Sequence, residues 1–422
     1  MTLLRRCNPD SVLASSRRPV DEVTLIAAGK IVEDVRSRGE LALREHAERL
    51  GDLEPGAPLV IEREELDACL SRLPEEDSSL LGRTAERIQA FAEAQRECLL
   101  PLDLEVEGGR AGHRWLPTAA AGAYAPGGRY PLPSSVLMTV IPARVAGVGA
   151  VWSASPRPAA VTQAAAAVAG ADGLLAVGGA QAVAALAFGT VTTPSDVIVG
   201  PGNRWVTAAK KYLFGEIGID GLAGPSELVV IADGSADPCV VAADLIAQAE
   251  HDPDAVPILI STSASLAAQV DDSISQLLAD LPTRDAAMES IERNGVAVVV
   301  DGIEAAAQLS DRLAPEHLEL QVENPGFLAS LVCCYGGLFV GSGSAEVFGD
   351  YGAGPNHVLP TGGGGRFQAG LSVATFLRPA TWMEIDASTR IAADAARLAR
   401  LEGLEGHARA ADLRTDHPAR LS

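Results

Sequence analysis

The chain is predicted to be an α/β protein built on parallel, doubly wound sheets. From residue 148 onward, short β-branched runs alternate with alanine-rich helical stretches. Alternation at this spacing is typical of strand–helix–strand units, which build parallel sheets. The same pattern starts again near residue 239, so a second α/β layer is expected. The length of 422 residues and the 47% apolar composition are enough for more than one hydrophobic core.

The first series of elements runs from residue 148 to residue 232. Runs rich in Val, Ile and Leu and bounded by Gly or Pro favour strands, and the longer Ala-rich runs favour helices. The expected strands are Val148–Ser153, Leu174–Val177, Asp196–Val199 and Glu227–Ala232. The expected helices are Pro158–Ala169, Gln181–Phe188 and Asn203–Phe214.

The second series runs from residue 239 to residue 341. Its expected helices are Cys239–Glu250, Ser265–Leu281 and Ile303–Leu313, and its expected strands are Val256–Ser261, Val296–Val300, Leu318–Val322 and Leu338–Gly341. Upstream, Val20–Leu50 and Ser78–Leu99 have helical apolar spacing and are expected to cover this second sheet. Ile391–Arg414 is expected to form a separate C-terminal helix with a glycine-broken end.

Charge and composition narrow the class of function. The formal net charge is −22, and no cluster of Lys and Arg with interleaved aromatic residues is present, which argues against nucleic-acid binding. The most apolar stretch, Ala159–Phe188, is mostly alanine and is interrupted by polar residues and glycines, so no membrane span is expected. Six cysteines without C-x-x-C spacing suit a reducing cytoplasm. We therefore expect a cytoplasmic protein that acts on a small molecule.

Three glycine-rich segments follow predicted strands of the first series. They are Gly122–Gly128, Val177–Gln181 and Gly200–Asn203. The dinucleotide fingerprint G-x-G-x-x-G is absent, so each segment alone is equally compatible with a simple tight turn. Together, at the carboxyl edge of one parallel sheet, they could admit a pyrophosphate, because glycines let the backbone approach it and helix N-termini favour its charge.

Four short segments in the second half of the chain carry four of its seven histidines together with several acids. They are Asp244–His251, Ala314–Glu319, Gly349–Thr361 and Glu402–His407. Spacing of i, i+3 places Gln248 and His251 on one helix face, where they could share a ligand or simply face solvent. Glu316 and His317 follow a proline at a helix-to-strand junction, where they could face a cleft or be exposed.

The sequences of these four segments and their order along the chain resemble those of the histidinol dehydrogenase family, and the similarity runs from about Ala123 to His407. The resemblance implies two Rossmann-like doubly wound domains, one inserted in the other, with a helical N-terminal segment and a C-terminal helical arm. The implied division is 1–19 for the N-terminal segment, 20–123 with 227–371 for the larger domain, 124–226 for the inserted NAD-binding domain, and 372–422 for an arm that reaches the active site of a partner subunit.

The resemblance also implies the cofactors and the residues of the site. One Zn²⁺ per subunit and NAD are expected in a homodimer with shared active sites. The implied zinc ligands are Gln248, His251, Asp350 and His407, and the implied NAD contacts are Tyr124, Gln181 and Asn203. The implied substrate contacts are Ser226, His317, His357 and Glu402 together with the four zinc ligands. An all-N/O ligand set without thiolate leaves coordination positions open to a substrate.

The implied reaction is the NAD-dependent oxidation of L-histidinol through L-histidinaldehyde to L-histidine, the last step of histidine biosynthesis. His317 is expected to act as the acid–base residue, because a neutral histidine suits proton transfer near pH 7. Glu316 is expected to activate the water that adds to the aldehyde. Three alternatives stay open: oxidation of another primary alcohol such as a sulfonated diol, a zinc hydrolase, and a non-catalytic metal-binding protein.

Two stretches depart from the family pattern. Gly362–Arg366 reads Gly-Gly-Gly-Gly-Arg where the family more usually has Gly-Gly-Thr-Ala-Arg, and the extra glycine could loosen a loop beside the active site because it adds backbone freedom. The segment Gly109–Ala121 matches the family poorly. Neither departure removes an expected functional residue.

Overall fold

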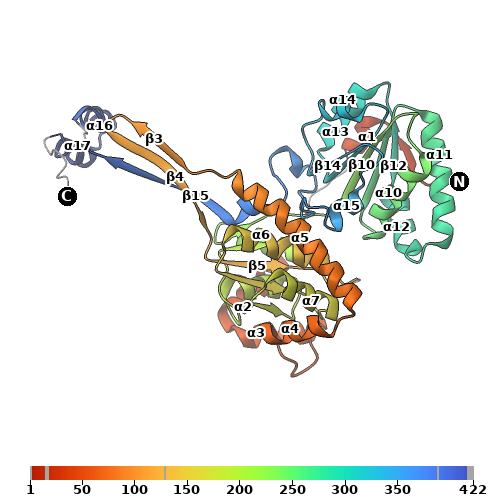
Figure 1. Cartoon of the computed structure of the whole chain (residues 1–422), viewed down its shortest axis with the longest axis horizontal. Coiled ribbons are helices and arrows are strands. Elements are labelled where there is room, and N and C mark those ends of the chain that lie inside the picture. Colours follow the sequence, from red (N-terminus) through yellow and green to blue (C-terminus); the bar gives the residue numbers. More distant parts are fainter. Residues whose placement is uncertain (1, 15–18, 128–129, 387–388, 416–422) are drawn as a thin grey trace.

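The computed structural model describes residues 2–14, 19–127, 130–386 and 389–415. Within these ranges the chain forms two six-stranded sheets covered by helices and a three-stranded sheet that extends away from the body as an arm (Figure 1). The predicted α/β class with parallel sheets is confirmed. None of the helices described is long and apolar enough to cross a bilayer.

Sheet A has the strand order β1-β12-β11-β10-β13-β14, and all its strands are parallel. Its strands are β1 (Arg5–Cys7), β10 (Glu227–Ala232), β11 (Val256–Ser261), β12 (Val296–Val299), β13 (His317–Gln321) and β14 (Gly337–Val340). The central strands are apolar runs because helices cover both of their faces.

The helices of sheet A divide between its two faces. Leu245 of α10 and Leu266 of α11 pack in one core, and Leu309 of α13 and Leu328 of α14 pack in the other. The sheet is therefore doubly wound. The helices are α1 (Pro9–Leu13), α10 (Pro238–Glu250), α11 (Ala264–Leu277), η1 (Leu278–Asp280), α12 (Arg284–Asn294), α13 (Ile303–Leu313), α14 (Pro325–Ala329) and α15 (Glu346–Asp350).

Sheet B has the order β2-β7-β6-β5-β8-β9 and is parallel except for its edge strand β2, which runs antiparallel to β7. Its strands are β2 (Val60–Glu62), β5 (Ala120–Tyr124), β6 (Ala150–Ala154), β7 (Gly173–Leu175), β8 (Val197–Val199) and β9 (Gly218–Ile219). The chain thus passes from β1 in sheet A through the whole of sheet B and back to sheet A.

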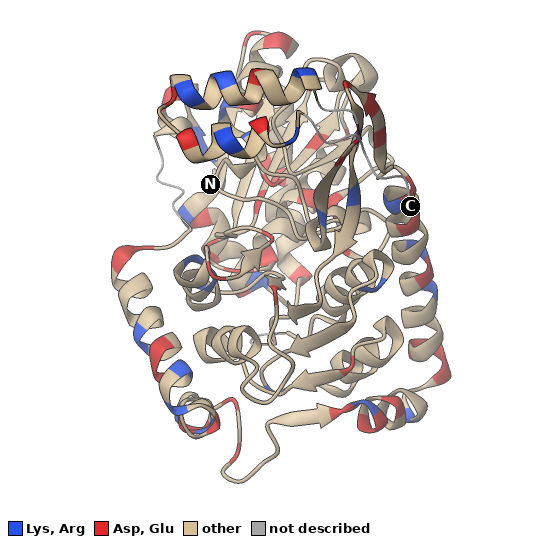
Figure 2. Cartoon of the chain, turned by 90° about the vertical axis from the view of Figure 1, so that its left-hand side faces the viewer, with Lys and Arg blue, Asp and Glu red and all other residues tan. Residues whose placement is uncertain are grey.

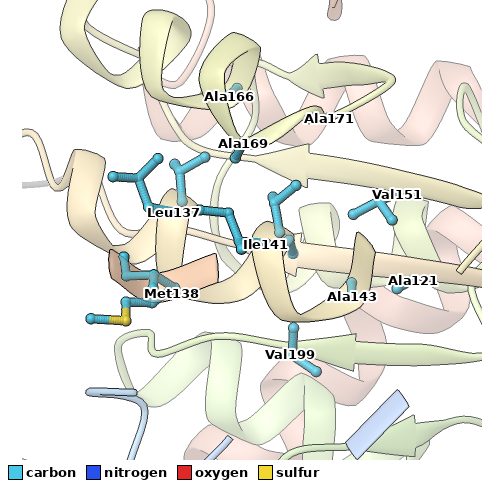
Figure 3. Packing of buried hydrophobic residues seen from close by; sticks show 14 of the residues in the cluster. Ala121, Leu137, Met138, Ile141, Ala143, Val151, Ala166, Ala169, Ala171 and Val199 are labelled. Carbon is cyan, nitrogen blue, oxygen red and sulfur yellow. The ribbon is translucent and has the colours of Figure 1, made fainter. Parts of the chain in front are cut away.

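Eight helices pack around sheet B. They are α2 (Glu22–Arg38), α3 (Glu40–Leu50), α4 (Arg63–Arg72), α5 (Glu75–Glu97), α6 (Pro133–Ala146), α7 (Ala160–Ala169), α8 (Gly179–Phe188) and α9 (Arg204–Leu213). On one face, Leu137 and Ile141 of α6 pack in a single cluster with Val151 of β6 and with Ala166 and Ala169 of α7 (Figure 3). The small alanine side chains let helix and sheet approach closely.

The prediction that the N-terminal helices cover sheet A is wrong. Val32 of α2 packs with Val183 of α8 and Leu213 of α9, and Ile88 of α5 packs with Val140 of α6, so these helices cover sheet B. An amphipathic pattern shows that a helix buries one face but not which sheet it covers. Residues 20–123 are expected in the larger domain, but the helices α2 and α5 of this range pack on sheet B.

The N-terminal segment expected over 1–19 also has a different role. Its residues 5–7 form β1, the edge strand of sheet A, and the side chain of Asp271 accepts hydrogen bonds from the backbone N–H groups of Leu3 and Leu4. Residues 1 and 15–18 of that segment lie outside the described ranges. The described residues 3–7 are therefore part of the second α/β layer and not of a separate helical extension.

The arm consists of an antiparallel three-stranded sheet with two helices at its tip (Figure 1). Its elements are β3 (Leu102–Val106), β4 (Gly109–Pro117), β15 (Leu377–Ile385), α16 (Thr389–Leu401) and α17 (Glu405–Asp412). The helical C-terminal end broken by glycine is confirmed, with Gly403 at φ +78° between the two helices. Both helices carry charges of either sign (Figure 2). The poorly matched segment Gly109–Ala121 contains the central strand of the arm.

Candidate active site

The start of β13 places Glu316 and His317 at the amino edge of sheet A. After α13, Ala314 adopts a left-handed conformation with φ +47°, and Pro315 cannot continue the helix. His317 then begins β13 directly. Ser226 precedes β10, the neighbouring strand, so it lies at the same edge. The abrupt change from helix to strand is what turns Glu316 toward Ser226.

Glu316 is a buried carboxyl group held by two donors. Its Oε2 accepts hydrogen bonds from Ser226 Oγ at 2.6 Å and from the backbone N–H of Glu227 at 2.9 Å. Burial raises the pKa of Glu316 to about 8, although the two donors act in the opposite direction. A carboxyl group whose pKa lies near neutrality is suited to exchange a proton with a reacting group.

His317 is held as a neutral imidazole with one nitrogen available. Its Nδ1 lies 3.1 Å from the carbonyl oxygen of Glu227. A carbonyl only accepts, so Nδ1 carries the hydrogen and Nε2 carries the lone pair. Nε2 has no hydrogen-bond partner among the described residues. Burial lowers the pKa of His317 to about 4, which keeps the ring uncharged at neutral pH.

The C-terminal end of α10 and the short helix α15 bring nitrogen and oxygen donors together. His251, the C-cap of α10, has its Nε2 3.5 Å from Asp350 Oδ2 and 3.7 Å from Glu346 Oε1. Gln248 lies one turn earlier on α10 and is fully buried, and neither of its side-chain polar atoms has a partner among the residues described. The C-terminal end of a helix favours a cation.

The acids around this position fit a bound divalent cation. Glu346 is 2% exposed, and burial raises its pKa well above the ordinary value, with the charges of Asp350 and Glu319 adding to the effect. Burial likewise raises the pKa of Glu319 to about 8. A metal ion would stabilise the ionised carboxylates, and the all-N/O donor set of Gln248, His251 and Asp350 suits zinc at a site that keeps positions open.

A cavity of about 270 Å³ opens beside these groups. Polar groups of His317, Asp350, Asn356 and His357 line it, and apolar side chains including Phe339 form other walls. His357 Nδ1 lies 3.0 Å from the backbone carbonyl oxygen of Asp350, which orients the ring. The cavity has room for a small polar molecule that contacts His317 and Asp350 at once.

The expected catalytic residues lie at the amino edge of sheet A, whereas the expected NAD contacts lie at the carboxyl edge of sheet B. Tyr124 ends β5, and its hydroxyl accepts a hydrogen bond from Gly179 N at 3.2 Å, at the start of α8. In the first turn of α8, Gln181 Nε2 donates to Asp52 Oδ2 at 2.9 Å. Burial raises the pKa of Tyr124 to about 12, so its hydroxyl is neutral. Gly128, the last residue of the first glycine-rich segment, lies outside the described ranges.

The turn after β8 is clamped by a buried ion pair. The N–H of Gly200 donates to Asp220 Oδ2 at 2.6 Å, and its carbonyl accepts from Lys210 Nζ at 3.0 Å. Lys210 and Asp220 also pair with each other, and their side chains are 3% and 4% exposed. Gly200 has φ +112°, and a Cβ there would collide with the carbonyl oxygen of Tyr124. Three residues on, Asn203 caps the N-terminus of α9.

The two edges meet at the first turn of α6, which follows β5. Ser135 Oγ lies 3.4 Å from His357 Nε2, and Asn356 Nδ2 donates to the carbonyl oxygen of Met138 at 2.6 Å. Two residues that line the cavity, Asn356 and His357, therefore contact the helix that follows the carboxyl end of β5. A substrate and a dinucleotide bound at the two edges would lie next to each other.

The structure brings together most, but not all, of the expected site residues. Ser226, Gln248, His251, Glu316, His317, Asp350 and His357 gather at the amino edge of sheet A. Glu402 and His407 do not join them. Both are exposed at the tip of the arm, at the other end of the molecule from α15 (Figure 1). Within one chain they cannot contact the cavity.

Sequence reasoning missed several residues that the structure places beside the site. Glu346 is the clearest case, and its signal was spacing: it precedes Asp350 by four residues, which on a helix puts both on one face. Asp52 had no such signal, because it reaches the loop at Gly178 from a distant part of the chain. The pair Lys210 with Asp220, although only 10 and 20 residues from Gly200, matches no regular spacing.

The extra glycine in Gly362–Arg366 does not leave an open loop. A Cβ at Gly365 would lie 2.8 to 3.1 Å from backbone atoms of Tyr335, so this position packs closely against the loop before β14. Gly362 N donates to Glu227 Oε1 at 3.1 Å, and Arg366 bonds to the carbonyl oxygen of Arg312. The expectation of a loosened loop is not supported by these contacts.

Comparisons with known proteins agree on one family. The model of the histidinol dehydrogenase family matches residues 16–415. A histidinol dehydrogenase of Parasynechococcus marenigrum is 46% identical over 389 residues, which cover 90% of this chain and 88% of that protein. One of Thermus thermophilus is 46% identical over 392 residues, which cover 91% of this chain and 93% of that protein.

Solved structures give the same result. The crystal structure of a histidinol dehydrogenase from Elizabethkingia anophelis matches with a TM-score of 0.91 and 30% identity, covering 98% of each chain. An acetylating aldehyde dehydrogenase from Geobacillus thermoglucosidasius matches with a TM-score of 0.50 and 15% identity over 89% of this chain and 93% of that one, a likeness of fold alone.

Proposed function

Because the chain belongs to the histidinol dehydrogenase family, we propose that it oxidises L-histidinol through L-histidinaldehyde to L-histidine with two molecules of NAD. The observation that carries this proposal is a neutral His317, next to a buried Glu316, at a cavity that Asp350 also lines. NAD supplies the hydride acceptor when bound, and a zinc ion supplies a Lewis acid that holds the substrate.

His317 serves as the proton acceptor for the alcohol. Its Nε2 carries the lone pair because Nδ1 donates to the Glu227 carbonyl group. As the hydride leaves the carbinol carbon, the hydroxyl proton passes to Nε2, which gives the aldehyde. After Nε2 has released the first proton to solvent, the second oxidation begins from the hydrated aldehyde, and the same nitrogen accepts the hydroxyl proton of the hydrate.

Glu316 serves the hydration step between the two oxidations. Water adds to the aldehyde carbon, and the ionised form of Glu316 accepts a proton from that water; the share of this form grows as the pH rises toward the pKa of about 8. Ser226 Oγ and the N–H of Glu227 both donate to Glu316 Oε2, so they hold the carboxyl group in place and stabilise its charged form. Ser226 would also contact the substrate.

Gln248, His251 and Asp350 would hold the zinc ion, one per subunit, and His357 and His317 would contact the substrate. The unpartnered, fully buried amide of Gln248 supports this assignment, because a buried amide without a hydrogen bond is costly unless a ligand satisfies it. An imidazole and an amine, as in histidinol, are suitable donors for the remaining coordination positions.

NAD would bind along the carboxyl edge of sheet B, with Tyr124, Gln181 and Asn203 as contacts. The helices α8 and α9 begin at this edge, so their N-termini favour a pyrophosphate. Gly200 permits the close approach of the loop, because no side chain fits against Tyr124. We also expect a cytoplasmic protein, since the cysteines described are free thiols.

A homodimer would complete each site with Glu402 and His407 of the other subunit. In support, the tip of the arm exposes Leu398 (58%) and Leu401 (68%), apolar side chains that a second copy could cover. The test combines His251→Asn with His407→Asn subunits after dissociation and reannealing. Mixed dimers hold one intact site, so about a quarter of all sites should regain activity. Purified mixed dimers that stay inactive, although each single variant is folded and dimeric, would disprove shared sites.

NADH absorbance on adding L-histidinol to metal-loaded protein tests the reaction itself. We expect NADH with histidinol and far less with a sulfonated diol. Faster turnover of the diol would favour the alternative substrate. No NADH from any alcohol, with hydrolysis of an ester or amide substrate instead, would favour a zinc hydrolase.

A further inference from the structure

A second cluster of metal-binding side chains lies away from the cavity, where α13 meets the loop before β14. Asp311 lies in the last turn of α13, and Cys333 and Cys334 are adjacent in that loop. Within the described residues, the sulfur atoms and a carboxylate oxygen of this trio lie within 4.8 Å of one another. Neither the family reaction nor the proposed function uses these three residues.

The carboxylate of Asp311 is preorganised by the backbone. Its Oδ1 accepts hydrogen bonds from the N–H of Cys333 at 2.9 Å and of Cys334 at 3.0 Å. These two bonds hold both cysteines against α13 and leave Oδ2 facing the thiols, 3.2 Å from Cys333 Sγ. The donors are therefore gathered by the fold before any ion binds, which lowers the entropic cost of binding one.

The spacing of the donors matches a tetrahedral ion. The two Sγ atoms are 3.7 Å apart. For a tetrahedral zinc site with Zn–S bonds of about 2.3 Å, two thiolates lie roughly 3.8 Å from each other, and a thiolate and a carboxylate oxygen lie roughly 3.5 Å apart. Cys333 is exposed, so the fourth position would face solvent.

The donor types suit a cation. The carboxylate of Asp311 lies beside the two thiols, and a divalent cation that binds there replaces the thiol protons.

We propose that Asp311, Cys333 and Cys334 form a second metal site, which takes a divalent cation of Zn²⁺ type through two thiolates and one carboxylate oxygen. Binding releases one proton from each thiol. The loop continues to Gly336 and Gly337, whose N–H groups donate to the carbonyl oxygens of Pro315 at 2.9 Å and Glu316 at 2.8 Å. An ion here would thus anchor the segment that pairs with the catalytic residues.

Titration of metal-free, reduced protein with Co²⁺ tests the proposal. The active-site donors include no thiol, so a thiolate-to-Co²⁺ charge-transfer band reports on the second site alone. We expect one equivalent of Co²⁺ per chain to produce this band, with release of about two protons at neutral pH. This readout does not depend on turnover, so it is separable from the proposed function.

Variants assign the band to the three residues. Cys333→Ser with Cys334→Ser should remove the band and one equivalent of bound Co²⁺. Asp311→Asn keeps an oxygen to accept the two backbone N–H groups but loses its charge, so it should weaken Co²⁺ binding about 10-fold or more. Cys98→Ser, at an exposed cysteine elsewhere, is the matched control and should change nothing.

A band that is absent from the wild-type protein would overturn the proposal, as would a band that survives the double substitution. If the double variant fails to fold, Cys333→Ser alone decides, since that side chain is exposed and its loss should still reduce the band and the affinity. Unchanged binding in this single variant would equally overturn the site.

Discussion

The two six-stranded sheets have the same parallel, helix-covered architecture, yet they offer opposite edges to their ligands. In sheet B the candidate NAD contacts lie at the carboxyl ends of the strands, at Tyr124, the last residue of β5, and at Asn203, in the turn after β8. In sheet A Ser226 lies just before β10, and the candidate catalytic residues lie at the start of β13, where Glu316 precedes the strand and His317 begins it. The usual rule places ligands at the carboxyl edge, and only sheet B follows it.

The charge of the ligand accounts for the difference. Helices run antiparallel to the strands they connect, so the carboxyl edge presents helix N-termini and the amino edge presents helix C-termini. The N-termini of α8 and α9 favour a pyrophosphate, whereas His251 lies at the C-terminus of α10, where a cation is favoured. This arrangement thus places an anion site at the carboxyl edge of sheet B beside a cation site at the amino edge of sheet A.

Removal of the metal should have the largest effect on turnover, and it should impair the site of sheet A without impairing that of sheet B. A chelator should abolish turnover, because the cation donors at the amino edge of sheet A hold the substrate through the ion. NAD binding at sheet B and the far-ultraviolet circular dichroism should remain, since the donors come from packed elements. Loss of the dichroism on chelation would show that the ion is structural and contradict this assignment.

Substitution of His317 should affect the chemistry at the amino edge alone. His317→Asn should slow both oxidations by roughly 10²–10⁴-fold, the usual effect of losing an acid–base group, with little change in the Kd for NAD. Single-turnover rates with histidinol and with histidinal measure the two steps. A loss confined to one of them would contradict a shared proton acceptor.

The clamp at Gly200 should affect the carboxyl edge alone. Lys210→Met combined with Asp220→Asn leaves no unpaired buried charge but removes the hydrogen bond to the Gly200 carbonyl group. We expect the Kd for NAD to rise roughly 10-fold, about 1.4 kcal/mol, with the affinity for histidinol unchanged. Lys211→Met, an exposed neighbour on α9, is the control. Equal NAD affinity in the double variant and the control would exclude a role for the clamp.

The smallest effect on turnover is expected for Glu319, whose substitution should change stability instead. Burial and the charge of Asp244 raise the pKa of Glu319 from 4.5 to about 8. The folded state therefore binds this proton more tightly than the unfolded state, and wild-type stability falls as pH rises from about 4.5 through 8. Glu319→Gln cannot ionise, so the metal-free variant should gain about 1–3 kcal/mol over wild type at pH 9 and little at pH 5.

Thermal unfolding of metal-free protein across this pH range measures the difference for Glu319→Gln. The exposed Glu304→Gln should show no such dependence. A stability advantage of Glu319→Gln that is constant with pH would mean that the carboxyl group does not titrate in this window.

Much of the site could be predicted because its residues cluster in short, recognisable segments. Glu316 with His317, and Asp350 with His357, are close in sequence, and the structure brings each pair together at the amino edge of sheet A. The position of α2 and α5 could not be predicted, since their apolar faces would fit either sheet. The arm strand β4 was missed because Gly109–Pro117 lacks a continuous apolar alternation and buries only one residue, Gly112.

The residues that hold loops from a distance were also beyond prediction. Asp52 contacts Gln181 across 129 positions of sequence, and no local pattern marks such a contact. Glu402 and His407 show the opposite situation. Their segment was recognised, but one chain alone leaves both at the tip of the arm, where only a second subunit could use them.

The number of NADH molecules formed per histidinol consumed tests the central claim most directly. Each of the two oxidations of one substrate requires both the catalytic residues of sheet A and the NAD-binding edge of sheet B. We predict two for the wild-type protein, with histidine as product. Glu316→Gln should give one NADH and accumulate histidinal, because only the second oxidation needs the hydrated aldehyde. A wild-type ratio of one with release of free aldehyde would contradict the account.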